Sequence, residues 1–479
     1  MKIGIGRIRN EIAPIHKLPR DLLEVVFHHA CWSDQHTTPR SAVALSHVCY
    51  QWRAILLSVP RFWSSVTVDG RDPSFAAACL VRSGDLLLDV VVQFNYVTPP
   101  EFLNADFNSG DLESEDVRRA LDECREGLTI LEAERDRVRR LCINYILLGV
   151  DWFQDEILEH DFFRYSLKNL QELRWNYADG GGVWSLPLQT FGGSLESLRS
   201  LRLENVEPSM GWFPGLTSLE CVRAPDIGFI EFLNGRVAEF FSQNASLQSL
   251  SIYEFRICEE KSTRISMDNL TSLTLSHVSR WYLLLDLLHI KNLDGGTFTT
   301  ITLSDQRPWI AFSAVNSIGF SLKACISSFG DPWEDAFMRQ YFSGVTVVRL
   351  EDFQMIHNTK RLLSILRILS GSRGDMGRME LHAEAKSLTT YPQVTAFAEP
   401  FLPRLRTLAI YLPDSAKSSG WVGVMIEDLF NPKHHARFPD ECTVEVHYSD
   451  PGVFLSANMG ELRAEFEDKG SYGCLVPRS

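Results

Sequence analysis

The 479-residue chain lacks the short motifs by which catalytic and metal sites are most often found in a sequence. Its ten cysteines include no CxxC pair, since no two of them lie within five residues of each other. There is no Gly-x-Ser-x-Gly nucleophile elbow, and Gly180-Gly181-Gly182 is not followed by the Lys-Ser or Lys-Thr of a phosphate-binding loop. The adjacent pairs His28-His29 and His434-His435 each point two ways and do not converge on one metal. We therefore expect no catalytic, cofactor-binding or metal site, and no enzyme activity.

Long apolar runs are also missing. The opening MKIGIGRIRNEIAP has no apolar core of the kind that secretory signals carry. The most apolar helical run, residues 281–290, is too short to span a bilayer. Several cysteines lie in apolar runs, as reduced core thiols do. These features favour a cytoplasmic or nuclear protein, in which the sequons at Asn244 and Asn269 would not be glycosylated.

An excess of positive charge is missing as well. The chain has 47 Lys and Arg against 61 Asp and Glu, a net charge of −14, and its basic residues are scattered. This argues against nucleic acid and anionic membranes as main partners. Hydrophobic residues make up 45% and charged residues 23%, as in ordinary globular proteins, and the length allows more than one core.

The most informative stretch that is present runs from Ile15 to Val66. Leu18-Pro19-Arg20-Asp21 predicts a helix start, because proline is pre-set for a first helical turn and Asp21 suits its positive end. Apolar residues then follow at helical spacing on one predicted face: Leu22, Leu23, Val26, Phe27 and Ala30. A polar loop is predicted over 34–40.

Two more helical patches complete this stretch. The first contains Val43 to Val48, and the second contains Trp52, Ile55 and Leu56 and ends before Pro60. The stretch holds many large apolar groups for so small a unit: Trp32, Trp52, Phe62 and Trp63. Each gains roughly 1.5–3 kcal/mol by leaving water, so some of them should face a partner or the next domain.

In order and spacing, the Leu-Pro pair, the apolar helix, Val48-Cys49-x-x-Trp52-Arg53 and Phe62-Trp63 resemble an F-box of the fungal type. The resemblance departs from the family at Arg20-Asp21 and in the long loop at 34–40. It implies docking onto the Skp adaptor of a cullin–RING ubiquitin ligase. The implied adaptor-binding surface is formed or supported by Leu18, Pro19, Leu22, Val26, Val48, Cys49 and Trp52. Trp52 and Trp63 fit an internal core equally, and we interpret Trp52 as mainly structural.

A linker with a helical insert is predicted between this module and the rest of the chain. Residues 86–92 form a strand-like apolar run, and residues 104–116 are rich in Gly, Ser and acids, as flexible loops are. Residues 114–140 alternate in charge and predict an amphipathic helix or helix pair. A short coiled coil is the alternative reading of that segment.

C-terminal to the linker, one sequence pattern recurs, called the repeat phrase below: apolar-x-x-apolar-x-apolar. Its central residues are Leu141, Leu173, Leu201, Leu219, Leu250, Leu273, Ile301, Ile318, Val348, Met379 and Leu408. Positions 141 to 408 span 267 residues in ten steps, a mean of about 27, which lies within the period of leucine-rich repeats. Helical segments are predicted between phrases at 237–243, 282–290 and 360–369. The best phrase, Leu195 to Asn205, supplies the Asn expected after the strand.

The predicted fold class is therefore α/β, with a short three-helix F-box followed by an irregular leucine-rich-repeat solenoid. The repeats resemble the divergent repeat region of fungal F-box proteins, and an ordinary α/β domain is the alternative. The expected boundaries are 1–14 for an N-terminal extension, 15–66 for the F-box-like module, 67–137 for the linker, 138–446 for the solenoid and 447–479 for a tail.

Variable strand positions of such a solenoid face its concave surface. They include Asn176, Ser251, Thr274, Ser276, Thr302, Ser304 and Glu351, and as substrate-binding candidates Arg174, Arg202, Glu204, Tyr253 and Arg349. The resemblance implies a non-catalytic substrate receptor that binds Skp, through Skp a cullin, and through its repeats an unidentified protein target for ubiquitin-dependent degradation. The alternative is a leucine-rich-repeat scaffold outside any ligase, whose N-terminal helices cap the solenoid.

Overall fold

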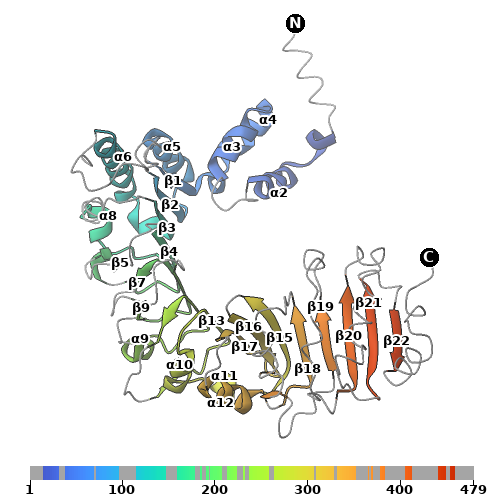
Figure 1. Ribbon diagram of the computed structural model, residues 1–479. Helices are drawn as coiled ribbons and strands as arrows, with labels where there is room; N and C mark the ends of the chain where they lie inside the picture. Colours follow the sequence, from blue (N-terminus) through green and yellow to red (C-terminus); the bar gives the residue numbers. More distant parts are fainter. Residues whose placement is uncertain are drawn as a thin grey trace. The chain divides into compact units, whose positions relative to one another are not determined.

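The chain forms two compact units, residues Met1–Gly228 with Glu239–Asn244, and residues Phe229–Ala238 with Ala245–Ser479. Figure 1 shows the computed structural model from which they are described. It describes residues 14–31, 38–69, 72–95, 115–146, 159–177, 184–185, 190–193, 195–207, 213–223, 230–231, 237–257, 264–306, 309–327, 332–342, 344–351, 365, 368–369, 378–382, 405–412, 441–448 and 454–458.

The first unit opens with a helical module. Its elements are η1 (Pro14–Lys17), α2 (Arg20–Cys31), α3 (Thr38–Ser46), α4 (Tyr50–Ser58) and the 3₁₀ turn η2 (Pro60–Trp63). The start of α2 confirms the predicted helix start, and α4 ends before Pro60, which disfavours helical backbone at the preceding Val59. The predicted loop over 34–40 is wrong at its end, because α3 begins at Thr38 with Pro39 in its first turn.

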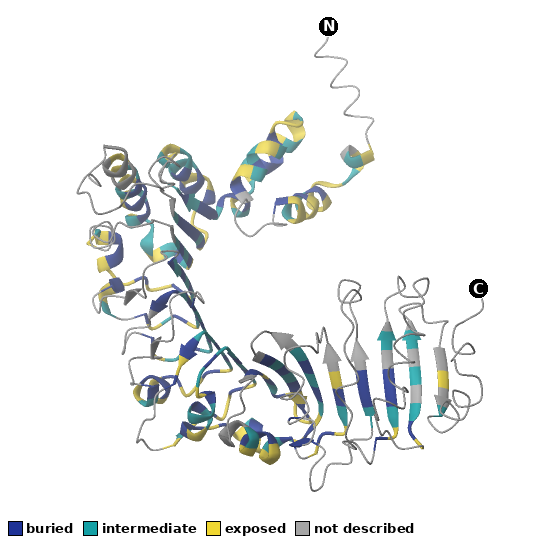
Figure 2. Cartoon of the chain, viewed as in Figure 1, coloured by how far each residue is buried: buried dark blue, intermediate teal, exposed yellow. Residues whose placement is uncertain are grey.

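Apolar residues of α2 divide between two sides of the helix. Leu23, Phe27 and Cys31 recur every four residues and are fully buried. Leu22 and Val26, predicted on the same face, are exposed. Figure 2 shows exposed positions along α2 in yellow. Adjacent positions on a helix point about 100° apart, so the apolar arc is too wide for one contact surface.

The two aromatic residues of η2 are buried within the chain. Trp63 donates its indole N–H to the Leu56 carbonyl at 2.8 Å, and the Arg82 guanidinium stacks over its ring at 4.6 Å. Arg82 belongs to α5 (Pro73–Ser83), which packs against η2 together with β1 (Ser65–Val68). Phe62 and Trp63 thus join the helical module to the sheet that follows.

The sheet of the first unit is parallel and follows the chain strand by strand. Its order is β1, β2 (Leu88–Asn95), β3 (Val138–Ile146), β4 (Glu172–Tyr177), β6 (Ser200–Glu204) and β8 (Ser218–Val222). A small parallel pair, β5 (Trp184–Ser185) and β7 (Val206–Glu207), accompanies it. Because β1 and β2 pair into this ladder, the sheet begins before residue 138, where the repeat pattern placed its start.

The predicted amphipathic helix over 114–140 is α6, which spans only Glu115–Glu132. The short turn η3 (Arg135–Arg137) follows, and β3 begins at Val138. Gly127 lies on the buried side of α6, where an added Cβ would collide with Val68 of β1. The short helices α8 (Asp161–Arg164) and η4 (Thr190–Gly193) also belong to this unit.

The sheet of the second unit is mostly parallel. Its order is β10 (Ser249–Tyr253), β13 (Ser272–Ser276), β17 (Ser321–Ser327), β16 (Trp309–Asn316), β15 (Phe298–Gln306), β18 (Val347–Glu351), β19 (Arg378–His382), β20 (Thr407–Leu412), β21 (Thr443–Tyr448) and β22 (Phe454–Asn458). β16 and β22 pair antiparallel with their neighbours. Two small parallel pairs, β9 (Ile230–Glu231) with β11 (Phe255–Arg256) and β12 (Ile265–Ser266) with β14 (Leu288–His289), lie beside it.

Described helices of this unit pack against its sheet at β15 and β16. They are α10 (Trp281–Leu287), α11 (Lys291–Asp294) and α12 (Pro332–Tyr341), while α9 (Val237–Gln243) is divided between the two units. Trp281 meets Phe337 edge to face at 4.8 Å, and Phe342 contacts Phe298 at 4.7 Å and Phe312 at 5.5 Å. These rings form the core between helices and strands. Residues 360–369, a predicted helix, lie mostly outside the described residues.

Most repeat phrases fall at equivalent positions of the ladders. Leu141, Leu173, Leu201 and Leu219 are register partners in the first unit, as are Leu250 and Leu273 in the second. Ile301, Val348, Met379 and Leu408 pair in the same way. The burial of these strands alternates, with the phrase residues buried and their neighbours half-buried.

The phrase centred on Ile318 is wrong. Val315 and Ile318 are 57% and 56% exposed, and they lie on a hairpin between β16 and β17 rather than on a repeat strand. The Asn316 side-chain oxygen accepts hydrogen bonds from the backbone N–H groups of Ile318 and Phe320, and Gly319 adopts φ +86°. The turn brings β17 beside β13. Leu322, rather than Ile318, therefore lies opposite Leu273. The fold is thus mixed α/β with large sheets.

Candidate functional site

The residues singled out in the sequence lie on the helical module and on strands of each of the two units. On the module, Leu22, Val25 and Val26 are 51%, 49% and 40% exposed. Residues three and four apart on a helix are neighbours, so these three side chains form one patch, named the α2 patch below. Val48, 53% exposed, adds an apolar group in the turn between α3 and α4.

The other predicted adaptor-binding residues are less uniform. Pro19 is exposed at the start of α2, and Leu18 is half-buried. Cys49 is half-buried and caps α4, since its sulfur accepts from the backbone N–H of Trp52 at 3.5 Å. Trp52 is half-buried too, with its ring against Phe27. Trp32 lies outside the described residues.

Charged groups gather around Glu24, on a different side of α2 from the α2 patch. Arg20 binds Glu24 at 2.9 Å, and Arg61 approaches the same carboxylate at 3.7 Å. Burial, together with the charges of Arg61 and His29, lowers the pKa of His28 below its ordinary value. His28 is therefore neutral at pH 7 and adds no positive charge to α2.

On the strands, the structure places the predicted substrate-binding residues in separate groups. Arg174 and Arg202 are register partners on β4 and β6, with Glu204 farther along β6. Arg174 pairs with Glu172 at 2.7 Å, and Arg202 pairs with Glu220 at 3.2 Å. Tyr253 and Arg349 belong to the second unit, on β10 and β18, and are not neighbours in its strand order.

Arg349 belongs to an ion-pair network that the sequence analysis missed. It binds Glu380 at 2.6 Å, and Arg378 binds both Glu380, at 2.8 Å, and Glu445, at 2.9 Å. Tyr411 accepts from Arg378 at 3.2 Å and stacks on His447 with ring centroids 4.5 Å apart. Burial alone would raise the pKa of Glu380, but hydrogen bonds from Arg378 and Arg349 outweigh it and lower that pKa.

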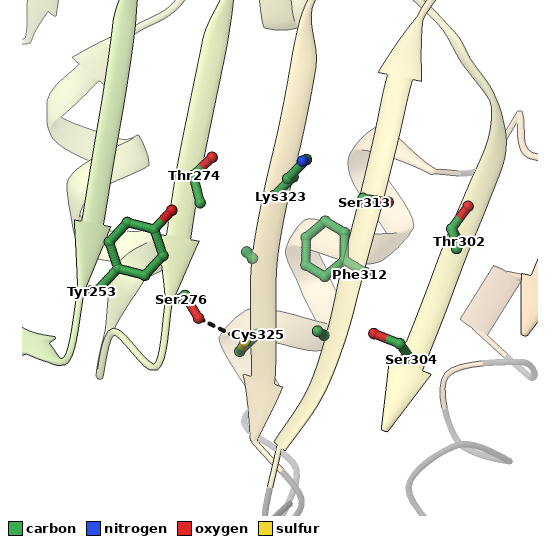
Figure 3. A pocket seen from close by; sticks show the side chains of 11 residues that line it. Tyr253, Thr274, Ser276, Thr302, Ser304, Phe312, Ser313, Lys323 and Cys325 are labelled. Carbon is green, nitrogen blue, oxygen red and sulfur yellow. Dashed lines mark hydrogen bonds between the residues drawn. The ribbon is translucent and has the colours of Figure 1, made fainter. Parts of the chain in front are cut away.

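Tyr253 belongs instead to a hollow of about 280 Å³ on the second sheet (Figure 3). Polar side chains from β10, β13, β15, β16 and β17 line it: Tyr253, Thr274, Ser276, Thr302, Ser304, Ser313, Lys323 and Cys325. Tyr253, Thr274, Ser276, Thr302 and Ser304 are among the predicted concave positions. We name this hollow, with the eight residues just given, the hydroxyl pocket.

Ser313, Lys323 and Cys325 of the hydroxyl pocket were missed. They lie on β16 and β17, which the repeat pattern misread as part of another phrase. The alternation in WIAFSAVN and SLKACIS around the turn at Asn316 is a period-two signal that identifies a hairpin. That signal was sufficient to place these residues on neighbouring strands.

Six of the eight described cysteines are buried, and Cys49 and Cys142 are half-buried. No described cysteine forms a disulfide, and burial raises the pKa of Cys79 and of Cys124 to about 12. Such thiols stay protonated at neutral pH and are poor nucleophiles. Within the described residues no group of three or more His, Cys, Asp or Glu side chains is placed to hold a metal ion. Nor does any helix in that part of the chain have the length and apolarity to cross a membrane.

No protein-family model matches this chain, and no curated protein matches it significantly. The resemblance to F-box proteins consequently depends on the quoted N-terminal residues, and the resemblance of the repeats on their pattern.

Proposed function

We propose that the chain is the substrate-recognition subunit of a Skp–cullin–F-box ubiquitin ligase, and that the helical module docks onto the Skp adaptor. The observation that carries the proposal is the α2 patch. Leu22, Val25 and Val26 are apolar yet exposed, on a helix in which Leu23, Phe27 and Cys31 are fully buried. Burying such side chains in an interface gains roughly 1.5–3 kcal/mol each at full burial.

The buried side of the module restricts this argument to the α2 patch and its neighbours. Phe62 and Trp63 are fully buried within the chain, so the surplus of large apolar groups noted in the sequence is partly absorbed by α5 and β1. The large apolar side chains that stay exposed on the described module are those of the α2 patch, Val48 and Tyr50. The clustering of three such side chains on α2, rather than exposure alone, is what a partner surface accounts for.

The strands supply the second half of the proposed function, which is target binding by a leucine-rich-repeat solenoid. Hydrogen bonds that join segments about one repeat apart support the solenoid. Asn205 donates to the Tyr177 carbonyl at 2.7 Å, and the Asn244 side chain accepts from the Leu216 N–H at 3.1 Å. In both, the separation is 28 residues, close to the mean spacing of the phrases. Stacked repeats contact only their neighbours, which is the pattern these bonds follow.

Co-purification tests the adaptor assignment. The full-length chain should co-elute with a fungal Skp homologue in size-exclusion chromatography. Leu22→Asp with Val26→Asp should abolish co-elution, because two charges would be buried in the interface. Val81→Asp is the matched control, since Val81 is an exposed apolar residue of α5 at 82% and lies outside the patch.

Two results would overturn the adaptor assignment. One is a wild-type chain that fails to bind the Skp homologue, and the other is binding that survives deletion of residues 15–66. Either would favour the alternative, a repeat scaffold whose N-terminal helices serve as a cap. That alternative predicts loss of solubility when the helices are removed.

A further inference from the structure

The hydroxyl pocket differs in its charges from the rest of the strand surface. Six of its side chains carry hydroxyl groups: Tyr253, Thr274, Ser276, Thr302, Ser304 and Ser313. Its one charged side chain is Lys323, and no carboxylate is among the lining residues. Figure 3 shows Lys323 between Thr274 and Ser313, and the strand register pairs it with both.

Lys323 also lacks the carboxylate partner that three strand arginines have. Arg174, Arg202 and Arg349 each lie within 3.2 Å of a carboxylate. Among the residues that the structure describes, no carboxylate forms an ion pair with Lys323, whose side chain is exposed. An ammonium group with hydroxyl donors on both sides is suited to an anion that is supplied from outside the chain.

The number of charges decides which anion fits. A phosphate monoester carries about −1.5 to −2 charges at pH 7 and is usually bound by several cations or by bidentate Arg. One ammonium group matches a single negative charge, as on a carboxylate. The volume of about 280 Å³ is at the lower limit for small-molecule pockets and suits one side chain of a polypeptide.

We propose that the hydroxyl pocket binds the carboxylate of an Asp or Glu side chain on a partner protein. Lys323 supplies the charge, and the hydroxyl groups of Thr274 and Ser313 donate hydrogen bonds to the carboxylate oxygens. The inference rests on the proposed recognition role of the strands and names the chemistry of the segment that they recognise.

The charge of the whole chain narrows the partner further. A net charge of −14 repels strongly acidic segments at long range. The favoured segment is therefore one acidic residue flanked by neutral or basic residues, rather than an acidic tract. Such a segment keeps the local attraction to Lys323 and lessens the general repulsion.

An array of random dodecapeptides, probed with the full-length chain, tests the proposal. Peptides with one Asp or Glu between neutral or basic flanks should be enriched among those that bind. Replacing that residue by Asn or Gln in a selected peptide should weaken binding at least tenfold, as measured by fluorescence anisotropy with fluorescein-labelled peptide. Phosphoserine at the same position should bind no better than Glu.

Variants of the chain assign the effect to the pocket. Lys323→Gln should weaken binding of the selected peptide at least tenfold, and Lys323→Arg should retain most of it. Thr274→Val with Ser313→Ala is a second variant, which should weaken binding while Lys323 is intact. Lys291→Gln, at an exposed lysine of α11 in the same unit, is the matched control and should bind like wild type.

The proposal is overturned by an array without acidic hits, by no hits at all, or by a phosphoserine preference. Unchanged affinity of Lys323→Gln, in a variant whose circular dichroism matches wild type, would also overturn it. The array needs no Skp homologue, so its failure leaves the adaptor assignment standing. Conversely, a chain that does not bind Skp can still select acidic peptides.

Discussion

The rings of Phe27 and Trp52 meet edge to face, with centroids 4.8 Å apart and planes at 61°. The contact joins α2 to α4 and uses Trp52 inside the module. Trp52 is the aromatic residue of the Val-Cys-x-x-Trp motif, so the structure places this residue in packing between helices, in agreement with its interpretation as mainly structural.

Trp52→Ala should destabilise the helical module by about 2–4 kcal/mol, because it removes a large ring from a packed contact that is only half-buried. Hydrogen exchange of backbone amides in α2 and α4 is the measurement, and protection should fall in both helices. Tyr50→Ala is the control on the same helix, since Tyr50 is 76% exposed and should change stability by less than about 0.5 kcal/mol. Equal effects of the two substitutions would contradict a structural role specific to Trp52.

Asn205 stabilises its turn in two separable ways. It adopts φ +57°, which few residues accept, and its side chain donates to the Tyr177 carbonyl. Asn205→Gly keeps the backbone conformation but loses the bond, so it should cost about 1–3 kcal/mol. Asn205→Ala loses both and should cost roughly 1 kcal/mol more. Urea unfolding measures the two costs, and a wild-type midpoint for Asn205→Gly would show that the bond contributes nothing.

The ion-pair network around Glu380 predicts a pH dependence of stability. The pKa of Glu380 is lowered from its ordinary value of 4.5, so its ionised form stabilises the folded chain above that pH. This stabilisation is lost as the pH falls through the lower pKa of the folded state. Wild type should exceed Glu380→Gln by about 1–3 kcal/mol at pH 7 in urea unfolding. The difference in unfolding free energy between the two chains should become smaller below pH 4.5. A difference that does not change with pH would contradict a stabilising role of the network.

The raised pKa values of Cys79 and Cys124 predict that both thiols are alkylated slowly in the folded chain. At pH 8 both thiols, with pKa about 12, should react with iodoacetamide far more slowly in the folded chain than in urea. Mass spectrometry of the alkylated peptides gives the rates residue by residue. Native-state labelling of Cys124 at its urea rate would show that α6 opens readily.

The repeat spacing predicted the strand ladders because one leucine-rich phrase produces one buried strand. Leu173 and Leu201, 28 residues apart in the sequence, are register partners for that reason. The repeat predicted around Ile318 was wrong because apolar residues at the same spacing also occur on hairpins. Here the turn at Asn316 determines the structure. Leu22 and Leu23 show a different limit. Both are apolar neighbours on one helix, and only the position of Phe27 and the other helices determines which of them is buried.

The candidate site was predictable in part for similar reasons. The shared sheet face of Tyr253, Thr274 and Thr302 follows from strand alternation, which is a local property of the sequence. The place of Lys323 beside Thr274 does not follow, because it depends on the insertion of β16 and β17 between β13 and β15. Likewise, the pairing of Arg378 with Glu445 joins residues 67 positions apart, across two strand boundaries.

The antiparallel insertion also bears on the order of folding. β15, β16 and β17 form a meander whose contacts close within residues 298–327, whereas every parallel pairing in this unit needs a longer crossover. Short loops close at lower entropic cost, so we expect this meander to form early and to serve as the template to which β13 and β18 add on either side. In φ-value analysis, Ala314 and Leu322 variants should give values well above those of Leu408 variants, and the reverse order would place the nucleus elsewhere.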